Sequence, residues 1–289
     1  MNGLAEWKLI VDGPGDPAWN MAVDEWLFQS VTSAGCIPTL RFYHWDGLAV
    51  SMGRFQSVER TIDTEQVGRL NIPLVRRITG GRGILHGDDL TLSVACRSSH
   101  LGLRMQGSIQ AVYTRLTGIL ADALTVVDVH TRQGTDVRFD TREPMMRRFN
   151  GPTGSMRNAG DCFTTVSSSD LIHVTSGTKV MGGALHRQGD VFLFQASIPL
   201  HSNPMQTQAP SSLEAPSVFR GPNSSGAPHP YVGIDAPQLR VAICSSFCDF
   251  GGDRLSTYQL GEHELAQVEL LADQRYRDRN WTWNTARSE

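Results

Sequence analysis

The chain has 289 residues, of which 40% are hydrophobic and 19% are charged, a balance that excludes an intrinsically disordered or fibrous protein for most of its length. Its 26 Lys and Arg and 29 Asp and Glu give a formal net charge of -3, so no global charge draws it to nucleic acid or an anionic membrane. No stretch approaches the ~20 apolar residues that span a bilayer, and the N-terminus lacks the basic start and apolar run of a signal peptide. We therefore expect a cytoplasmic protein that binds neither nucleic acid nor membrane.

The hydrophobic periodicity predicts a mixed α+β fold. A helix is expected over 19–31, where apolar residues recur at nearly helical spacing after a Gly/Pro-rich turn. Two paired strands follow over 39–43 and 48–52, joined by a turn that ends in Asp46-Gly47. The other expected elements are strands over 72–78, 90–96, 170–175, 178–181 and 190–198 and helices over 105–124, 236–250 and 262–276. Because the strands cluster between helices without regular alternation, we expect mixed β-sheets flanked by helices, not a doubly wound parallel sheet.

Two stretches differ from the rest in composition. Residues 130–160 hold six arginines and three acidic residues, which indicates a locally basic loop. Residues 201–230 contain six prolines with many Ser, Gly, Asn and Gln residues, so they lack the apolar surface needed to fold on their own. We expect one domain over 1–289 that carries both stretches as loops.

The glycine-rich run over 75–94, VRRITGGRGILHGDDLTLSV, is the most unusual local sequence. It links two expected strands through Gly80, Gly81 and Gly83, which surround Arg82. Glycine lets a ligand approach the backbone closely, and arginine supplies a fork of donors for carboxylate or phosphate. The run matches neither a Walker A loop nor a dinucleotide-binding fingerprint. An anion- or carbonyl-binding turn and a purely structural glycine hairpin both fit the residues.

A cysteine and a lysine stand on either side of an expected turn. Ser176-Gly177 would reverse the chain and bring Lys179 back toward Cys162. A cation beside a thiol favours the thiolate, which is the form that attacks an acyl carbon. The residues equally allow a small buried Cys162 and a solvated Lys179. The chain's five cysteines form no paired framework, and no metal-binding motif is visible, so we expect neither a disulfide scaffold nor a metal.

Three runs together resemble the lipoate-protein ligase and octanoyltransferase family, whose catalytic domain is shared with biotin ligases. They are RRITGGRGILHGDDLTLSV over 76–94, TKVMGGALHRQGDVFLFQASI over 178–198 and LADQRYRDRNWTWN over 271–284. The resemblance extends from about Trp7 to Asn284. It implies the α+β fold of the biotin/lipoate protein ligase catalytic domain, without a C-terminal accessory domain.

Two details resemble the cysteine-dependent octanoyltransferase branch of that family: the Gly80-Gly81-Arg82 turn, and Cys162-Phe163 standing eight residues before Asp170. This resemblance implies that Cys162 takes an octanoyl group from acyl carrier protein as a thioester and passes it to a lysine of a lipoyl domain. Such acceptors are the glycine-cleavage H protein and dehydrogenase E2 subunits. Lys179 would keep the thiol ionised and donate to the acyl carbonyl. The charge balance favours a monomer, and we expect no cofactor.

The resemblance also implies further contacts with the substrate, and it leaves two alternatives open. The residues expected at the substrate are Arg77, Thr79, Gly80, Gly81, Arg82, His86, Gly183 and Ala184. An apolar tunnel for the acyl chain is expected to be lined by Trp26, Phe42 and Val75. In one alternative the chain is an ATP-dependent lipoate ligase, in which Lys179 stabilises an acyl-adenylate and Cys162 is a bystander. In the other it is a relative without catalytic activity.

Overall fold

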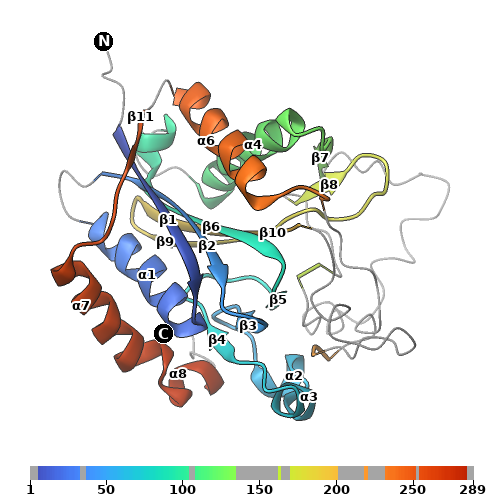
Figure 1. Ribbon diagram of the computed structural model, residues 1–289, viewed down its shortest axis with the longest axis vertical. Helices are drawn as coiled ribbons and strands as arrows, with labels where there is room; N and C mark the ends of the chain where they lie inside the picture. Colours follow the sequence, from blue (N-terminus) through green and yellow to red (C-terminus); the bar gives the residue numbers. More distant parts are fainter. Residues whose placement is uncertain are drawn as a thin grey trace.

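A six-stranded mixed sheet lies at the centre of the computed structural model, which describes residues 6–32, 37–103, 108–134, 162–163, 170–200, 218–220, 232–251 and 254–284 (Figure 1). The strand order is β11-β1-β2-β6-β10-β9. These strands are β1 (Glu6–Gly15), β2 (Thr39–Trp45), β6 (Asp89–Arg97), β9 (Gly182–Gln188), β10 (Val191–Pro199) and β11 (Arg254–Thr257). β1 runs parallel to β11 and β2, whereas the pairs β2–β6, β6–β10 and β10–β9 are antiparallel.

Two smaller sheets and the helices complete the described fold. One sheet has the order β4 (Leu74–Arg76), β3 (Ala49–Met52), β5 (Ile84–His86), and the other pairs β7 (Thr131–Gln133) with β8 (Leu171–His173). The helices are α1 (Pro17–Ser30), α2 (Val58–Thr61), α3 (Thr64–Arg69), α4 (Ile109–Val126), α6 (Ala236–Gly251), α7 (Glu262–Leu271) and α8 (Arg279–Trp283), with a 3-10 turn η1 (Ser98–Leu101) and a π-helical turn η4 (Ala272–Tyr276). The predicted mixed α+β class is confirmed.

The two faces of the central sheet differ in chemistry. One face packs under α4 and α6 and carries apolar side chains such as Phe42, Leu92 and Phe194. The other face meets α1, on the side of the sheet where α7 also lies (Figure 1). It presents polar side chains, among them Arg41 and Gln195. Because successive strand residues point to opposite faces, one set of strands builds both an apolar core and a buried polar layer.

The predicted pairing of 39–43 with 48–52 is wrong. The chain does turn between them, at Gly47 with φ of +78°. However, β2 pairs with β1 and β6, whereas β3 pairs with β4 and β5. The side chains of β2 are buried on both faces, as expected of a strand with a neighbour on each side. The turn therefore passes the chain from one sheet to another.

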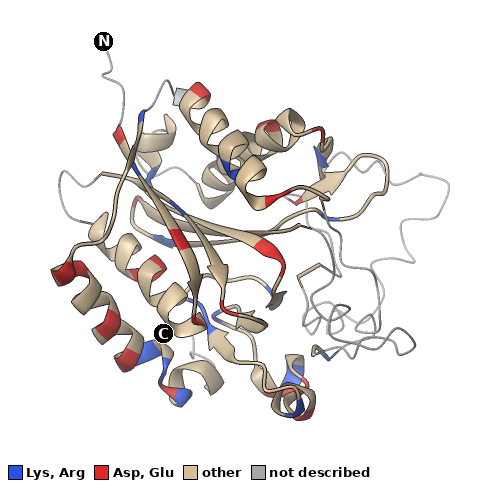
Figure 2. Cartoon of the chain, in the orientation of Figure 1, with Lys and Arg blue, Asp and Glu red and all other residues tan. Residues whose placement is uncertain are grey.

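The two loops expected from composition, over 130–160 and 201–230, lie mostly outside the described residues. Within the described part of the chain, every helix is too short or too polar to cross a membrane. Figure 2 shows acidic side chains gathered along α7. Arg277 pairs with Glu269 and Asp273 there, at 2.6 Å from each, so part of this acidic face is neutralised locally.

Arg76 in β4 joins the C-terminal part of the fold to the loop that follows β3. Its guanidinium is fully buried and donates to the carbonyls of Gly53, Arg54 and Gln56, and also to those of Trp281 and Thr282 in α8. Burial lowers the pKa of Arg76 to about 10. The glycine-rich run and the closing Trp-Thr-Trp run of the sequence are therefore in direct contact.

We expect Arg76→Met to destabilise the protein by about 3 kcal/mol or more, because several buried carbonyls would lose a charged donor at once. The loss is measured as the free energy of unfolding in urea. Arg69→Met, at an exposed position on α3, is the matched control and is expected to stay within about 0.5 kcal/mol of the parent. Equal losses in the two variants would contradict this role for Arg76.

Candidate active site

The thiol of Cys162 and the ammonium of Lys179 lie side by side. Lys179 Nζ is 3.2 Å from Cys162 Sγ and 3.1 Å from Cys162 O, and it pairs with Asp170 Oδ2 at 3.1 Å. All three residues are buried, with exposed fractions of 3% to 7%. The three N–H donors of the ammonium are thus directed at sulfur, carbonyl and carboxylate. The predicted proximity of Cys162 and Lys179 is confirmed.

A tight turn sets Lys179 in this place. Gly177 adopts φ of +69°, a left-handed conformation that suits glycine. Across the turn, His173 N donates to Thr178 O, and Ile172 bridges to Lys179. Cys162 is held from the other side, because its N–H donates to Gly83 O at 2.8 Å. The cysteine is thereby tied to the glycine-rich run.

The surroundings of Lys179 keep it positively charged. Burial by itself lowers the pKa of Lys179, but the charges of Cys162 and Asp170 and the hydrogen bonds to both outweigh it, so the pKa is raised. Asp170 is a residue that the sequence marked only by its spacing from Cys162. The structure adds it as the buried counter-ion of the lysine, so the site comprises a thiol, an ammonium and a carboxylate.

Arg77 forms the inside of the glycine turn. Its five N–H donors reach Thr79 Oγ1, Ser51 O, Ser51 Oγ, Gly80 O and Arg82 O. Burial lowers the pKa of Arg77 to about 10. Gly81 has φ of +83°, and its carbonyl oxygen would lie 2.1 Å from a Cβ at Gly53. Because all five donors meet protein acceptors, Arg77 holds the shape of the turn.

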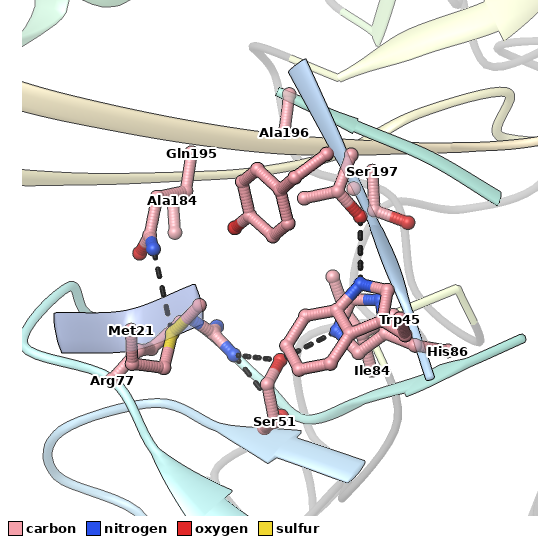
Figure 3. Close-up of a pocket in the computed structure, with 13 residues that line it drawn as sticks. Met21, Trp45, Ser51, Arg77, Ile84, His86, Ala184, Gln195, Ala196 and Ser197 are labelled. Carbon is pink, nitrogen blue, oxygen red and sulfur yellow. Dashed lines mark hydrogen bonds between the residues drawn. The ribbon is translucent and has the colours of Figure 1, made fainter. Parts of the chain in front are cut away.

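A pocket lies between the glycine turn and the polar face of the sheet, and its empty space of about 280 Å³ includes the part that is open to solvent (Figure 3). We call this pocket the cavity. Three of the residues expected at the substrate, Arg77, His86 and Ala184, line it. Thr79 lies beneath it, where its hydroxyl donates to Gln195 Oε1 at 2.6 Å. Gly183 faces the opposite side of β9, against Tyr113 and Phe194. Gly80, Gly81 and Arg82 form the turn held by Arg77.

None of the three residues expected at an acyl tunnel lines this cavity. Trp26 donates to Gln267 in α7, Phe42 belongs to the core beneath α4, and Val75 is packed in the core with α1. The cavity is instead lined by Tyr43 and Trp45. They alternate with Phe42 along β2, so Phe42 points to the opposite face of this strand.

His86 is fixed in the cavity wall by contacts on both ring nitrogens. Nδ1 is 2.9 Å from Asp89 Oδ2 and Nε2 is 2.8 Å from Ser51 Oγ, while the ring stacks on Trp45 with 3.9 Å between centroids. Burial alone would raise the pKa of Asp89, but the His86 ring and hydrogen bonds from His86, Gly87 and Ser197 lower it to about 2. Figure 3 shows Ser51 reaching both His86 and Arg77. This network supports the wall of the cavity.

A buried polar network that the sequence did not reveal runs below the cavity. Gln195 Nε2 donates to Asp24 Oδ2 at 2.6 Å, and Arg41 and Ser93 both donate to Asp24 Oδ1. Through Thr79 this network continues to Arg77. Among the described residues, no three His, Cys, Asp or Glu side chains gather in a way that could hold a metal ion.

The family model of the lipoyl protein ligase A/B catalytic domain matches residues 16–217. Octanoyltransferase LipM of Moorella thermoacetica is 34% identical over 68% of this chain and 66% of its own. Octanoyltransferase LipM of Halalkalibacterium halodurans is 30% identical over 97% of this chain and 99% of its own, and that of Bacillus subtilis is 29% identical over 96% and 98%.

Solved structures share the fold. A lipoate-protein ligase A bound with ATP superposes with a TM-score of 0.73 at 21% identity, over 96% of this chain and 98% of that one. A bipartite archaeal lipoate protein ligase from Thermoplasma acidophilum, from a study of the ligase and its E2 lipoyl domain, gives a TM-score of 0.74 at 20% identity, over 99% of both chains.

Proposed function

The chain belongs to the lipoyl protein ligase A/B catalytic domain family, and we propose that it is an octanoyltransferase of lipoate biosynthesis that carries the acyl group on Cys162. The observation that carries this proposal is the 3.2 Å contact between Lys179 Nζ and Cys162 Sγ inside a buried site. Relatives that align over nearly the whole chain are named octanoyltransferases, and this supports the choice of reaction.

In the first half-reaction, the Cys162 thiolate attacks the thioester carbonyl of an octanoyl group on acyl carrier protein. A new bond forms between Sγ and the acyl carbon, and the bond from that carbon to the carrier's sulfur breaks. The carrier's sulfur leaves as a thiolate and takes up a proton from solvent. Negative charge develops on the acyl oxygen in between, and the Lys179 ammonium beside the sulfur is placed to donate to it.

In the second half-reaction, a lysine amine of a lipoyl domain attacks the octanoyl thioester on Cys162. An amide bond forms, the thiolate of Cys162 leaves, and the proton lost from the amine passes to solvent. Asp170 keeps Lys179 charged and oriented throughout both steps. The octanoyl chain occupies the cavity beside the glycine turn, where Ile84 and Ala184 supply apolar wall. No metal or cofactor takes part in this scheme, and the chain acts as a single domain and a monomer.

The reaction is tested by offering the two acyl sources separately. We expect octanoylation of a lipoyl-domain lysine when octanoyl carrier protein is the donor and ATP is omitted, measured by mass spectrometry of the acceptor. Free octanoate with ATP is the comparison. Octanoylation only in that second mixture would make the protein a ligase that works through an acyl-adenylate, and no octanoylation in either mixture would indicate a relative without this activity.

A further inference from the structure

Gly182 occupies the space between the thiol of Cys162 and the cavity. It is the first residue of β9, the edge strand of the central sheet, and it lines the cavity together with Ile84. A Cβ placed on Gly182 would lie 3.3 Å from Cys162 Sγ and 2.9 Å from Ile84 Cδ1. It would also lie 3.4 Å from the ring of Phe163. One methyl group at this point would therefore touch both the sulfur and the cavity wall.

The backbone conformation at residue 182 does not require glycine. Gly182 is absent from the described residues with positive φ, and glycine in a strand weakens the strand unless another group must approach closely. Ala184 stands two residues further along the same face, carries a Cβ and also lines the cavity. The groups that approach Gly182 closely are the sulfur and Ile84. Glycine at 182 thus serves to leave space open.

We propose that Gly182 is a specificity-determining residue: the gap left by its missing side chain is the opening through which an acyl chain on Cys162 enters the cavity. The inference rests on the proposed function, because it takes Cys162 as the atom that carries the chain. An acyl chain that runs from Sγ directly into the cavity passes Gly182, since a Cβ at this residue would meet the sulfur and the residue lines the cavity. The length of acyl chain that the enzyme accepts then depends on this gap.

A methyl group at residue 182 narrows the opening. It either displaces Ile84 Cδ1 toward the cavity or remains in close contact with it and with the sulfur. An octanoyl chain has to pass this point, whereas an acetyl group ends beside the sulfur. We expect Gly182→Ala to slow octanoylation of Cys162 by about tenfold or more, the discrimination that one methylene group gives in an apolar pocket. Acetylation is expected to stay close to that of the parent.

The experiment compares the parent protein with Gly182→Ala, Ile84→Val and the double variant. The rates of acyl-adduct formation on Cys162 are measured by intact mass with the acetyl and octanoyl thioesters of one carrier protein. Ile84→Val removes the Cδ1 atom that the new methyl group would meet, so the double variant is expected to regain octanoylation. Gly118→Ala, where a Cβ has nothing within 4 Å, is the matched control and is expected to change neither rate.

Alkylation of Cys162 by iodoacetamide, together with thermal unfolding, shows in each variant that the thiol is accessible and the fold intact. Octanoylation of Gly182→Ala at the parent rate would overturn the inference. The inference would also be overturned if Gly182→Ala lost acetylation and octanoylation equally and the double variant with Ile84→Val regained neither. If the parent protein itself forms no octanoyl adduct, the proposed function is wrong as well. If the parent and Gly182→Ala form the adduct at the same rate, only the inference about Gly182 is wrong.

Discussion

Replacing Cys162 with alanine is expected to abolish octanoyl transfer, with a fall of at least about 10⁴-fold, the scale reached when a catalytic nucleophile is removed. Among the other described thiols, Cys244 and Cys248 lie on α6. Cys96 is fully buried in the core, and burial raises its pKa to about 12. The rate of octanoyl-lysine formation on a lipoyl domain measures the effect.

Cys244→Ala is the matched control for this substitution. Cys244 is a half-buried thiol on α6, and burial raises its pKa to about 11. It is expected to retain the parent rate. If Cys162→Ala retained transfer instead, the acyl group would have to pass directly from donor to acceptor, and the thioester scheme would be wrong.

Replacing Lys179 with methionine is expected to slow acylation of Cys162 by about 10²- to 10³-fold, because the donor to the developing oxyanion is lost. The same change leaves Asp170 buried without its counter-ion. Breaking a buried pair in this way costs about 3–5 kcal/mol of stability. Both quantities are measured, the first as the rate of adduct formation and the second as the free energy of unfolding.

The double variant Lys179→Met/Asp170→Asn separates chemistry from stability. It removes both buried charges, so we expect it to recover most of the stability that Lys179→Met loses. Its acylation rate is expected to stay low, because the positive charge beside Sγ is still missing. A double variant that regained both stability and acylation would limit Lys179 to a structural role.

Local patterns in the sequence predicted the four longest helices and three of the six central strands, β2, β6 and β10, but not which strands pair with one another. Asp46-Gly47 correctly marked a reversal of the chain, and two apolar runs on either side of such a turn are typical of a hairpin. Which strand lies beside which is decided by long-range contacts. β2 has buried side chains on both faces and lies between β1 and β6, so no position beside it remained for β3.

Three strands of the central sheet, β1, β9 and β11, were not predicted, and both β9 and β1 have weak patterns. β9 begins with Gly182-Gly183 and contains His186 and Arg187, which is not the alternation expected of a half-buried strand. It forms as an edge strand because it pairs with β10. β1 contains Gly13 and Pro14 near its end, where its register with β2 shifts.

The part of the site that depends on short-range signals was predictable, and the part built by distant residues was not. Ser176-Gly177 marked the turn that places Lys179, and the contact with Cys162 followed from it. By contrast, Gln195 and Asp24 are 171 positions apart and meet only through the packing of α1 on the sheet. No local pattern identifies such a pair. For the same reason, no local pattern showed that Tyr43 and not Phe42 faces the cavity, since the face that each residue of β2 presents is set by the packing around the strand.

The most direct test of the account is to locate the acyl group on the protein. The protein is incubated with octanoyl carrier protein in the absence of an acceptor, digested, and mapped by mass spectrometry. The account predicts one octanoyl group on the peptide that contains Cys162, bound as a thioester that hydroxylamine releases. An octanoyl group on any other residue, or none while the protein still transfers octanoyl to a lipoyl domain, would contradict it.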